Sequence, residues 1–193
     1  MIFEKVSRLA DEEIVMPVRK TGASAGYDLA AADDYIIPSL WQLCDEAKRL
    51  WNVNDDEFVT MDLMSQFTKR TGFKPTLVST GVKCKLDPDK YLQLSVRSSL
   101  PLKHWLVLAN GVGIIDADYY DNKDNEGEIF LQIYNLSPFN IQIEKGEAIG
   151  QGVILPYYTT EDDCADGERT GGFGSTSRTF KSKAEMVNNF MSQ

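Results

Sequence analysis

The stretch Asn110-Gly111-Val112-Gly113-Ile114-Ile115-Asp116-Ala117-Asp118-Tyr119 decides how the chain around it folds. Two glycines within an apolar run predict a tight turn between two strands, because glycine has no side chain and lets a backbone approach a flat ligand closely. A carboxylate, Asp116, follows the run, and the ring of Tyr119 comes three residues later. We therefore predict a strand-turn-strand hairpin over 110–119 that carries Asp116 at its rim.

Short apolar runs on both sides of this hairpin predict a protein made mainly of β-strands. After Pro75 the runs recur at regular spacing with turn residues between them, which is typical of an antiparallel sandwich or jelly roll. These runs are 76–80, 91–96, 105–109, 129–134, 141–143 and 148–155. Before Pro75, the segment 35–38 ends one more strand, and 14–16, which is followed by Pro17, predicts a strand at a sheet edge.

Residues 40–73 follow a different period from the rest of the chain. Apolar residues recur at helical spacing between charged ones in 40–51 and again in 58–67. Asn54 or its neighbour is expected to cap the second helix, and Gly72 is expected to end it. We therefore predict an α-helical hairpin inserted at 40–73, whose Trp and Met side chains pack against the body or against a partner subunit.

Composition limits the partners of the chain, which we expect to fold as a single domain over 1–193. The formal net charge is −9, whereas binding to nucleic acid or to an anionic membrane by bulk attraction calls for a basic face. Three cysteines, odd in number and far apart, argue against a disulfide framework or a zinc knuckle and favour a reducing cytoplasm. No apolar run approaches the roughly 18 residues of a membrane span or resembles a secretory signal.

The only histidine of the chain, His104, narrows the chemistry. Serine–histidine, cysteine–histidine and multi-histidine zinc sites all need an imidazole, and His104 alone beside Trp105 is expected to be structural. The features that remain are a carboxylate, phosphate-binding groups and a glycine-rich backbone. Together they favour hydrolysis of a phosphoanhydride, in which the hairpin binds a nucleobase and Asp116 activates the attacking water. The donors suited to the phosphates are Arg97, Ser98, Ser99, Gln151 and Arg169.

Four polar features have more than one interpretation. The glycine-rich arm 167–178 is either simply flexible or able to wrap a phosphate chain, and it lacks the Gly-Lys-Ser/Thr ending of a P-loop. The tail 181–193 is either a short docking helix or a frayed end. The acidic loop 121–128 does not have EF-hand spacing, so we expect a solvated hairpin tip rather than a metal site. Asp28 resembles a turn carboxylate that binds its own backbone.

Five blocks of sequence occur in one order, and the third and fifth of them are highly specific. The blocks are 25–29, 97–100, 110–119, 146–151 and 169–176. In order and spacing they closely resemble the homotrimeric dUTPase family, and they span nearly the whole chain. The resemblance implies a dUTPase-like β jelly roll, a homotrimer with shared active sites, and Mg²⁺-dependent hydrolysis of dUTP to dUMP and pyrophosphate.

The resemblance also implies roles for single residues. Asp116 matches the carboxylate that deprotonates the water attacking the α-phosphorus. Tyr119 matches the ring that lies under the deoxyribose and excludes a 2′-hydroxyl group. Asp28 matches the carboxylate associated with Mg²⁺, generally through water, and the ion itself bridges the triphosphate oxygens.

Three sets of residues match substrate contacts of the family. The first set holds uracil through the hairpin and leaves no room for a 5-methyl group: Asn110, Gly113, Ile114 and Ile115. The second set contacts the phosphates: Arg97, Ser98, Ser99 and Gln151. The third set belongs to the arm that closes over the γ-phosphate and the base, usually on another subunit's site: Arg169, Phe173, Gly174 and Ser175.

The chain departs from the family pattern in four places. The insert 40–73 is extra, and Trp105 stands where a glycine is common. The loop after Tyr119 is longer than usual. Arg169 is one residue nearer to Phe173 than in the commonest form of the arm.

Two other functions stay open. A dCTP deaminase shares this fold, but it needs a glutamate base where this chain has Gln132, and an amide cannot perform that proton transfer. A regulatory or binding protein on the same scaffold would use 40–73 as a surface for a protein partner. Because Asp116, Tyr119 and Phe173 occur together, we favour an active enzyme, to which such a role can be added.

Overall fold

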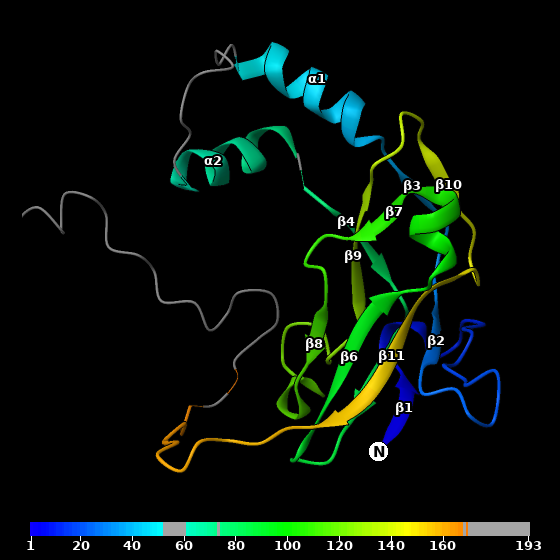
Figure 1. The fold of residues 1–193 in the computed structure, drawn as a ribbon, viewed down its shortest axis with the longest axis vertical. Helices are drawn as coiled ribbons and strands as arrows, with labels where there is room; N and C mark the ends of the chain where they lie inside the picture. The colour runs from blue at the N-terminus through cyan, green and yellow to red at the C-terminus, as the bar shows by residue number, and fades with distance from the viewer. Residues whose placement is uncertain (52–60, 73, 168, 170–193) are drawn as a thin grey trace, which may run out of the picture.

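Antiparallel strands build the body of the protein (Figure 1). The computed structural model describes residues 1–51, 61–72, 74–167 and 169. Within these residues the strands are β1 (Ile2–Lys5), β2 (Tyr27–Ala30), β3 (Tyr35–Ile37), β4 (Thr76–Ser79), β5 (Val82–Lys85), β6 (Lys90–Val96), β7 (Leu106–Leu108), β8 (Gly113–Ile115), β9 (Phe130–Asn135), β10 (Ile141–Ile143) and β11 (Ala148–Pro156). Along β9 the side chains alternate between half-buried and buried, as expected for a strand with one face on the core.

The sheet that carries the candidate site has the strand order β2-β11-β6-β8. A second sheet has the order β4-β9-β7, and the pairs β1-β5 and β10-β3 complete the body. Neighbouring strands are mostly distant in sequence, which is typical of a jelly roll rather than of a meander. The mainly β jelly roll predicted from the sequence is therefore confirmed. Its register places Gln151 of β11 between Asp28 of β2 and Ser95 of β6.

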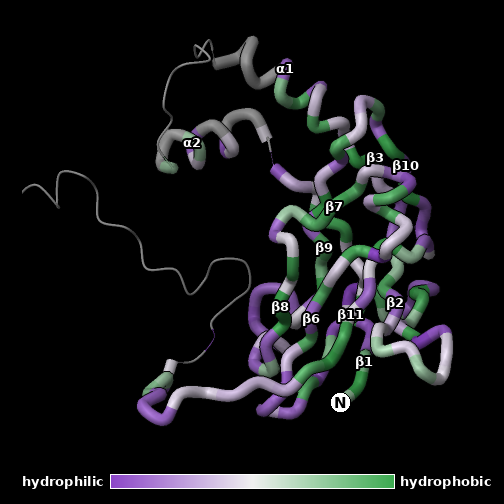
Figure 2. The backbone as a smooth tube through the Cα atoms, viewed as in Figure 1, coloured by the Kyte–Doolittle hydropathy of each residue, from purple (hydrophilic) through white to green (hydrophobic). Residues whose placement is uncertain are grey.

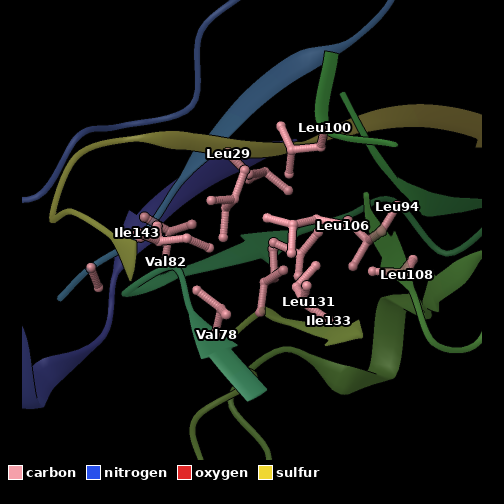
Figure 3. Packing of buried hydrophobic residues seen from close by; sticks show 14 of the residues in the cluster. Leu29, Val78, Val82, Leu94, Leu100, Leu106, Leu108, Leu131, Ile133 and Ile143 are labelled. Atoms are coloured by element: carbon pink, nitrogen blue, oxygen red, sulfur yellow. The ribbon is translucent and has the colours of Figure 1, made fainter. Parts of the chain in front are cut away.

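One apolar cluster fills the space between the sheets (Figure 3). Leu29 of β2, Val78 of β4 and Leu131 of β9 have no exposed surface, and Leu94 of β6 points toward them. Burial of each such side chain stabilises the fold by about 1.5–3 kcal/mol relative to its exposure to water. The tube in Figure 2 accordingly shows apolar residues along β8 and β11 and polar residues in loops of the body.

The insert contains the two predicted helices, α1 (Leu40–Trp51) and α2 (Met61–Thr71), at one end of the body (Figure 1). Ser39 fixes the start of α1, because its hydroxyl donates to the Ser137 carbonyl at 2.7 Å. Gly72, with φ of +72°, ends α2 as predicted, and its N–H donates to the Thr68 carbonyl. The cap expected near Asn54 lies outside the described residues.

Three of the described side chains of the insert lack the packing that was expected of them on the body. Met61 and Met64 of α2 are exposed by 89% and 42%, although both belong to the predicted apolar stripe. Trp41 of α1 is exposed by 59%. These three side chains therefore do not stabilise the insert by burial against the jelly roll.

Two parts of the strand prediction need correction. Residues 14–16 form a loop rather than an edge strand: Ile14 reaches the core, but Pro17 has no N–H for a ladder, and backbone pairing begins only at Val18, opposite Asp28. The pair β1 and β5 was not predicted. β5 alternates apolar residues with lysine, whereas β1 has two apolar residues followed by two charged ones, and four residues are too few to distinguish a strand from a charged loop.

Candidate active site

The strand-turn-strand course predicted around 110–119 is confirmed, but the predicted hairpin is wrong, because β7 pairs with β9 and β8 pairs with β6 in another sheet, and not with each other. β7 leads into a turn in which the Gly111 N–H donates to the Leu108 carbonyl at 3.0 Å, with Gly111 at φ +69°. β8 then pairs with β6, and Gly113 lies opposite Leu94. A Cβ at Gly113 would lie 3.0 Å from the Leu94 Cβ, so a side chain there would push β8 away from β6. The two glycines thus permit the turn and the close strand pairing.

Asp116 follows β8 and presents an exposed carboxylate. Its backbone is extended, and the Tyr119 N–H donates to its carbonyl at the start of the 3₁₀ turn Ala117–Tyr119. The Asp116 Oδ2 accepts a hydrogen bond from Arg169 Nη2 at 2.5 Å. The Asp116 side chain is therefore within reach of solvent and is paired with a cation.

Asp118 shares that cation and was not among the predicted site residues. Its Oδ1 accepts a hydrogen bond from Arg169 Nε at 2.7 Å. Burial lowers the pKa of Arg169, but the bonds to Asp118 and Asp116 outweigh it and raise the pKa above its usual value. The two carboxylates and Arg169 line a cavity of about 370 Å³ together with Pro88 and Tyr157. Asp118 comes two residues after Asp116, at the start of a short turn. This spacing is the signal that could have identified Asp118 from the sequence.

Tyr119 lies directly behind this ion pair. The guanidinium carbon of Arg169 is 5.8 Å from the centroid of the Tyr119 ring, which is within the range of a cation–π contact. The ring is buried, and its hydroxyl donates to the Glu128 carbonyl at 3.0 Å. Burial raises the pKa of the Tyr119 phenol, so the side chain stays neutral at physiological pH.

The residues predicted to contact phosphates lie at the ends of β6 and β11. Arg97 Nε is 3.6 Å from Asp28 Oδ1, and the Gln151 side-chain amide donates to the Ser95 hydroxyl at 3.3 Å. Ser98 is exposed and Ser99 is half-buried. Arg97 and Ser99 line a second cavity, of about 260 Å³, to which His104 and Glu147 also contribute. Asp116 and Arg97 therefore line different cavities of this chain.

Asp28 has an unusual environment for a carboxylate. It belongs to β2, and its N–H donates to the Val18 carbonyl, so the turn-carboxylate interpretation is wrong. Its Oδ2 is buried and has no hydrogen-bond partner among the described residues. An unsatisfied buried carboxylate oxygen is costly, which points to a water or cation held there.

The donor set around Asp28 fits one kind of magnesium site. No cluster of three or more His, Cys, Asp or Glu side chains that could hold a metal occurs among the described residues. Mg²⁺ commonly keeps several waters and is bound through one or two carboxylates together with substrate phosphates. The unpartnered Asp28 Oδ2 and the nearby Arg97 and Gln151 fit an ion that arrives with a triphosphate.

Two further expectations concern the borders of the site. Trp105, where the family commonly has glycine, adopts φ of +57°, a left-handed conformation in which glycine carries no steric penalty. It directly follows the π-helical turn Leu100–His104. Among the predicted uracil contacts, Asn110 and Ile114 are exposed and Ile115 is half-buried. The arm residues Phe173, Gly174 and Ser175 and the tail 181–193 lie outside the described residues.

Similarity to known proteins covers most of the chain. A family model described as dUTPase matches residues 49–177. The deoxyuridine 5′-triphosphate nucleotidohydrolase of Lactococcus lactis subsp. lactis (strain IL1403) is 36% identical over 179 residues, which cover 90% of this chain and 95% of that protein. A protein of the same name from Hahella chejuensis (strain KCTC 2396) is 31% identical and covers 91% of this chain and 95% of its own length.

Solved structures with the same fold include two dUTPases. The crystal structure of the enzyme from Streptococcus mutans has a TM-score of 0.62 and 33% identity, covering 82% of this chain and 98% of that chain. The dUTPase of phage phi11 of S. aureus has a TM-score of 0.57 at 18% identity, covering 86% and 96%, and shows the fold alone. A variant of the phage protein is described with a structural Mg(II) ion. By the family model and by relatives that match nearly their whole length, the chain belongs to the dUTPase family of deoxyuridine 5′-triphosphate nucleotidohydrolases.

Proposed function

We propose that the protein hydrolyses dUTP to dUMP and pyrophosphate, with Asp116 as the general base. The observation that carries this proposal is the exposed Asp116 carboxylate directly after β8, beside the Tyr119 ring and the Arg169 guanidinium. Asp116 takes a proton from a water, and the resulting hydroxide attacks the α-phosphorus. A positioned base of this kind typically contributes about 10²- to 10⁴-fold to the rate.

The turn between β7 and β8, together with β8, supplies the nucleobase site in this proposal. Gly111 permits the turn and Gly113 lets β8 lie against β6, so the backbone of 110–115 can present its N–H and C=O groups to the edge of a pyrimidine. Uracil is the base that the family relatives indicate. A 5-methyl group would need space that a backbone-lined site does not have, which is the proposed reason for rejecting thymine.

The triphosphate is proposed to bind at the ends of β6 and β11. Arg97 and Ser99 offer charged and hydroxyl donors, and Gln151 lies between Asp28 and Ser95. Asp28 is the residue that would hold Mg²⁺, through water, at its unpartnered oxygen. When bound, Mg²⁺ neutralises part of the phosphate charge.

Arg169 connects substrate binding to the base. Its guanidinium bonds Asp116 and Asp118 in this structure, and a γ-phosphate is a stronger partner because it carries more charge. We propose that a bound triphosphate draws Arg169 away from Asp116, which leaves the Asp116 carboxylate free to accept a proton. In this order of events, the water is activated only when substrate is present.

A homotrimer with shared sites is the assembly that we propose. The proposed base and the phosphate donor Arg97 line separate cavities of one chain, so a neighbouring chain can bring the two sets of groups together. The exposed Met61 and Met64 of α2 also make the insert available to a protein partner.

Within the described residues, no helix is long and apolar enough to span a membrane. The three free cysteines support a reducing cytoplasm as the compartment.

Pyrophosphate release from dUTP, dCTP, dTTP and UTP tests the proposal, with and without Mg²⁺. We expect release from dUTP alone at a substantial rate, and its loss when the metal is chelated. Ammonia release from dCTP would instead identify a deaminase, despite Gln132 in β9. Hydrolysis of none of the four nucleotides would favour a binding protein on the same scaffold.

A further inference from the structure

The loop that follows Tyr119 is only in part the solvated tip that its composition predicts, since Asp121, Lys123 and Asp124 are exposed and the other residues are not. Asn122 and Gly127 are buried, and Asn125 and Glu126 are half-buried, although the segment is polar and acidic. Burial of amide and backbone groups is unfavourable unless they are hydrogen-bonded. The bonds that these groups form converge on Tyr119.

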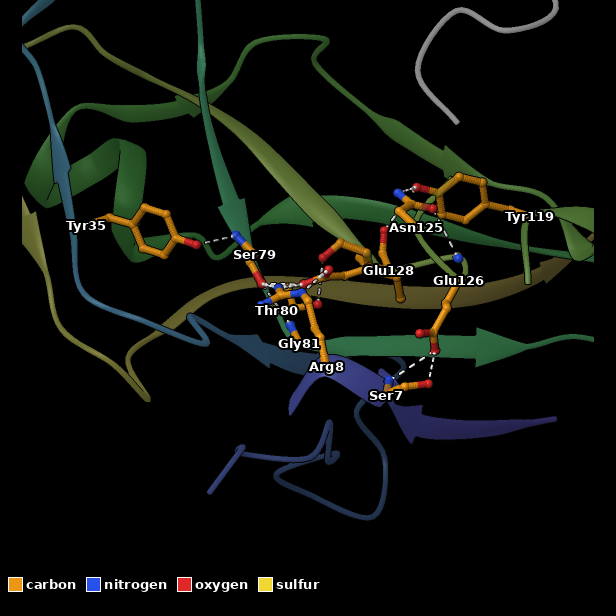
Figure 4. A network of polar contacts seen from close by, with 12 residues as sticks. Ser7, Arg8, Tyr35, Ser79, Thr80, Gly81, Tyr119, Asn125, Glu126 and Glu128 are labelled. Atoms are coloured by element: carbon orange, nitrogen blue, oxygen red, sulfur yellow. Dashed lines mark hydrogen bonds and ion pairs between the residues drawn. The ribbon is translucent and has the colours of Figure 1, made fainter. Parts of the chain in front are cut away.

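The hydroxyl of Tyr119 is held by two partners (Figure 4). It donates to the Glu128 carbonyl at 3.0 Å, and it accepts from the Asn125 side-chain amide at 2.8 Å. One donated and one accepted bond nearly exhaust what a phenol can form in a buried position. The far end of the ring is therefore fixed, whereas its face is turned toward Arg169.

The orientation of the Asn125 amide follows from its other contacts. Its oxygen accepts from the Gly127 N–H at 3.1 Å and from the Asn122 side-chain amide at 2.8 Å. A backbone N–H can only donate, so the oxygen must face Gly127 and the NH₂ group must face the Tyr119 hydroxyl. Asn122 in turn donates to the Tyr119 carbonyl at 2.8 Å, which closes the network.

The backbone of the loop is shaped to fit against Tyr119. Gly127 has φ of +79°, and a Cβ there would lie 2.5 Å from the Tyr119 carbonyl oxygen. Glu126 is left-handed at φ +58°, a conformation that is unfavourable for a residue with a side chain. Its carboxylate accepts from the N–H and the hydroxyl of Ser7 at 3.0 and 2.7 Å, which offsets this strain. The loop is thus anchored to the N-terminal segment and carries Asn125 to a defined place.

We propose that Asn125 is a positioning residue that holds the Tyr119 ring against the sugar and so sets the selectivity for deoxyribose over ribose. The inference rests on the proposed function, in which the sugar lies on this ring. A ring whose hydroxyl is free can tilt and admit a 2′-hydroxyl group. A ring held by Asn125 and by Glu128 must break buried hydrogen bonds before it can move.

Asn125→Asp is the sharpest single test. A carboxylate keeps the acceptors for Gly127 and Asn122 but cannot donate to the phenol, so the loop is retained while the single proton of the Tyr119 hydroxyl can no longer serve Glu128 and residue 125 together. We expect the ratio of kcat/KM for dUTP to that for UTP to fall about five- to tenfold, the equivalent of one ordinary hydrogen bond. Lys123→Ala, at an exposed position of the same loop, is the matched control and should leave the ratio unchanged.

A double-mutant cycle separates positioning from general support of the fold. Tyr119→Phe keeps the ring and removes the hydroxyl, and it should lower the same ratio. In the Tyr119→Phe background, Asn125→Asp should have no further effect, because its only route to the sugar is gone. Additive effects, or an unchanged ratio in either single variant, would overturn the proposal.

The same measurements distinguish failure of this inference from failure of the proposed function. If the wild-type protein hydrolyses dUTP but the dUTP-to-UTP ratio is unchanged in Asn125→Asp, the proposed function stands and this inference fails. Wild-type protein that does not hydrolyse dUTP loses both. If Asn125→Asp does not fold, as judged by its thermal unfolding, the ratio in Tyr119→Phe alone decides the matter.

Discussion

Arg169 places its guanidinium against the two carboxylates that follow β8, Asp116 and Asp118, and this contact is open to direct test. Arg169→Gln should raise the KM for dUTP about tenfold or more, since a hydrogen bond to a charged group contributes about 1.5–3 kcal/mol. The kcat should change less, because Asp116 remains in place. Arg169→Lys keeps the positive charge but loses the planar guanidinium that can form two hydrogen bonds at once, so it should give an intermediate KM. Steady-state kinetics with an unchanged KM in Arg169→Gln would contradict the proposed release of Asp116 by substrate.

Cys84 gives a prediction about pH. Burial raises the pKa of its thiol to about 11 from 9.0, so the folded state favours the neutral thiol. That contribution to stability is complete below pH 9, where the thiol of the unfolded chain is also neutral. It is lost as the pH rises from about 9 to 11, at up to about 1.4 kcal/mol per pH unit.

Denaturant unfolding of wild type and of Cys84→Ala across this range measures the effect. The difference in unfolding free energy between them should shrink as the pH rises, because Cys84→Ala lacks the thiol. A difference that stays constant from pH 8 to pH 11 would show that the buried thiol does not titrate in this way. Cys44 and Cys164 are exposed and should react with a thiol reagent in the folded protein, while Cys84 should not.

The chemistry at single positions was predictable only in part. The position of Asp116 directly after β8 follows from the apolar run that precedes it, whereas the role of Tyr119 rests on the resemblance to the dUTPase family. Asp118 and Asn125 did not stand out, since an acid or an amide in a polar segment looks the same whether it faces water or a buried ring. The contacts that distinguish these cases are the bond from Asn125 to the Tyr119 hydroxyl and the bond from Arg169 to Asp118. Both depend on how the chain turns after β8, which local sequence does not show.

At the level of elements, the insert could be recognised because its apolar period changes abruptly from that of strands to that of a helix. The prediction at residues 14–16 failed because three apolar residues in a row are too short a pattern. They do not show whether their backbone will hydrogen-bond to a neighbouring strand. β1 and β5 depend on each other for pairing, and neither has a strong pattern of its own. Local pattern therefore identified the long elements and missed those that tertiary pairing creates.

Replacement of residues 40–73 by a short turn tests the independence of the insert. Ser39 and Lys74 flank it, and Met61 and Met64 in α2 are exposed on this chain. We expect the shortened protein to remain folded and to hydrolyse dUTP, as judged by circular dichroism and pyrophosphate release. Loss of soluble trimer in sedimentation would show instead that the helices hold subunits together.

At the level of the whole molecule, the separation of Asp116 and Arg97 into two cavities predicts complementation between subunits. Asp116→Asn and Arg97→Ala should each be nearly inactive alone. Subunits of both kinds, unfolded, mixed in equal amounts and refolded together, should recover about a quarter of wild-type activity, because one site in four then combines two intact partners. Recovery of no activity would place the whole site within one chain.

Attack by an Asp116-activated water is the central claim, and dUMP formation under saturating dUTP tests it most directly. Asp116→Asn preserves size and removes the base, so kcat should fall by about 10²- to 10⁴-fold. Asp118→Asn alters the neighbouring carboxylate that bonds the same Arg169, and it should retain most of the wild-type kcat. Equal rates for wild type and Asp116→Asn, or an equally large loss in Asp118→Asn, would contradict the assignment of the base.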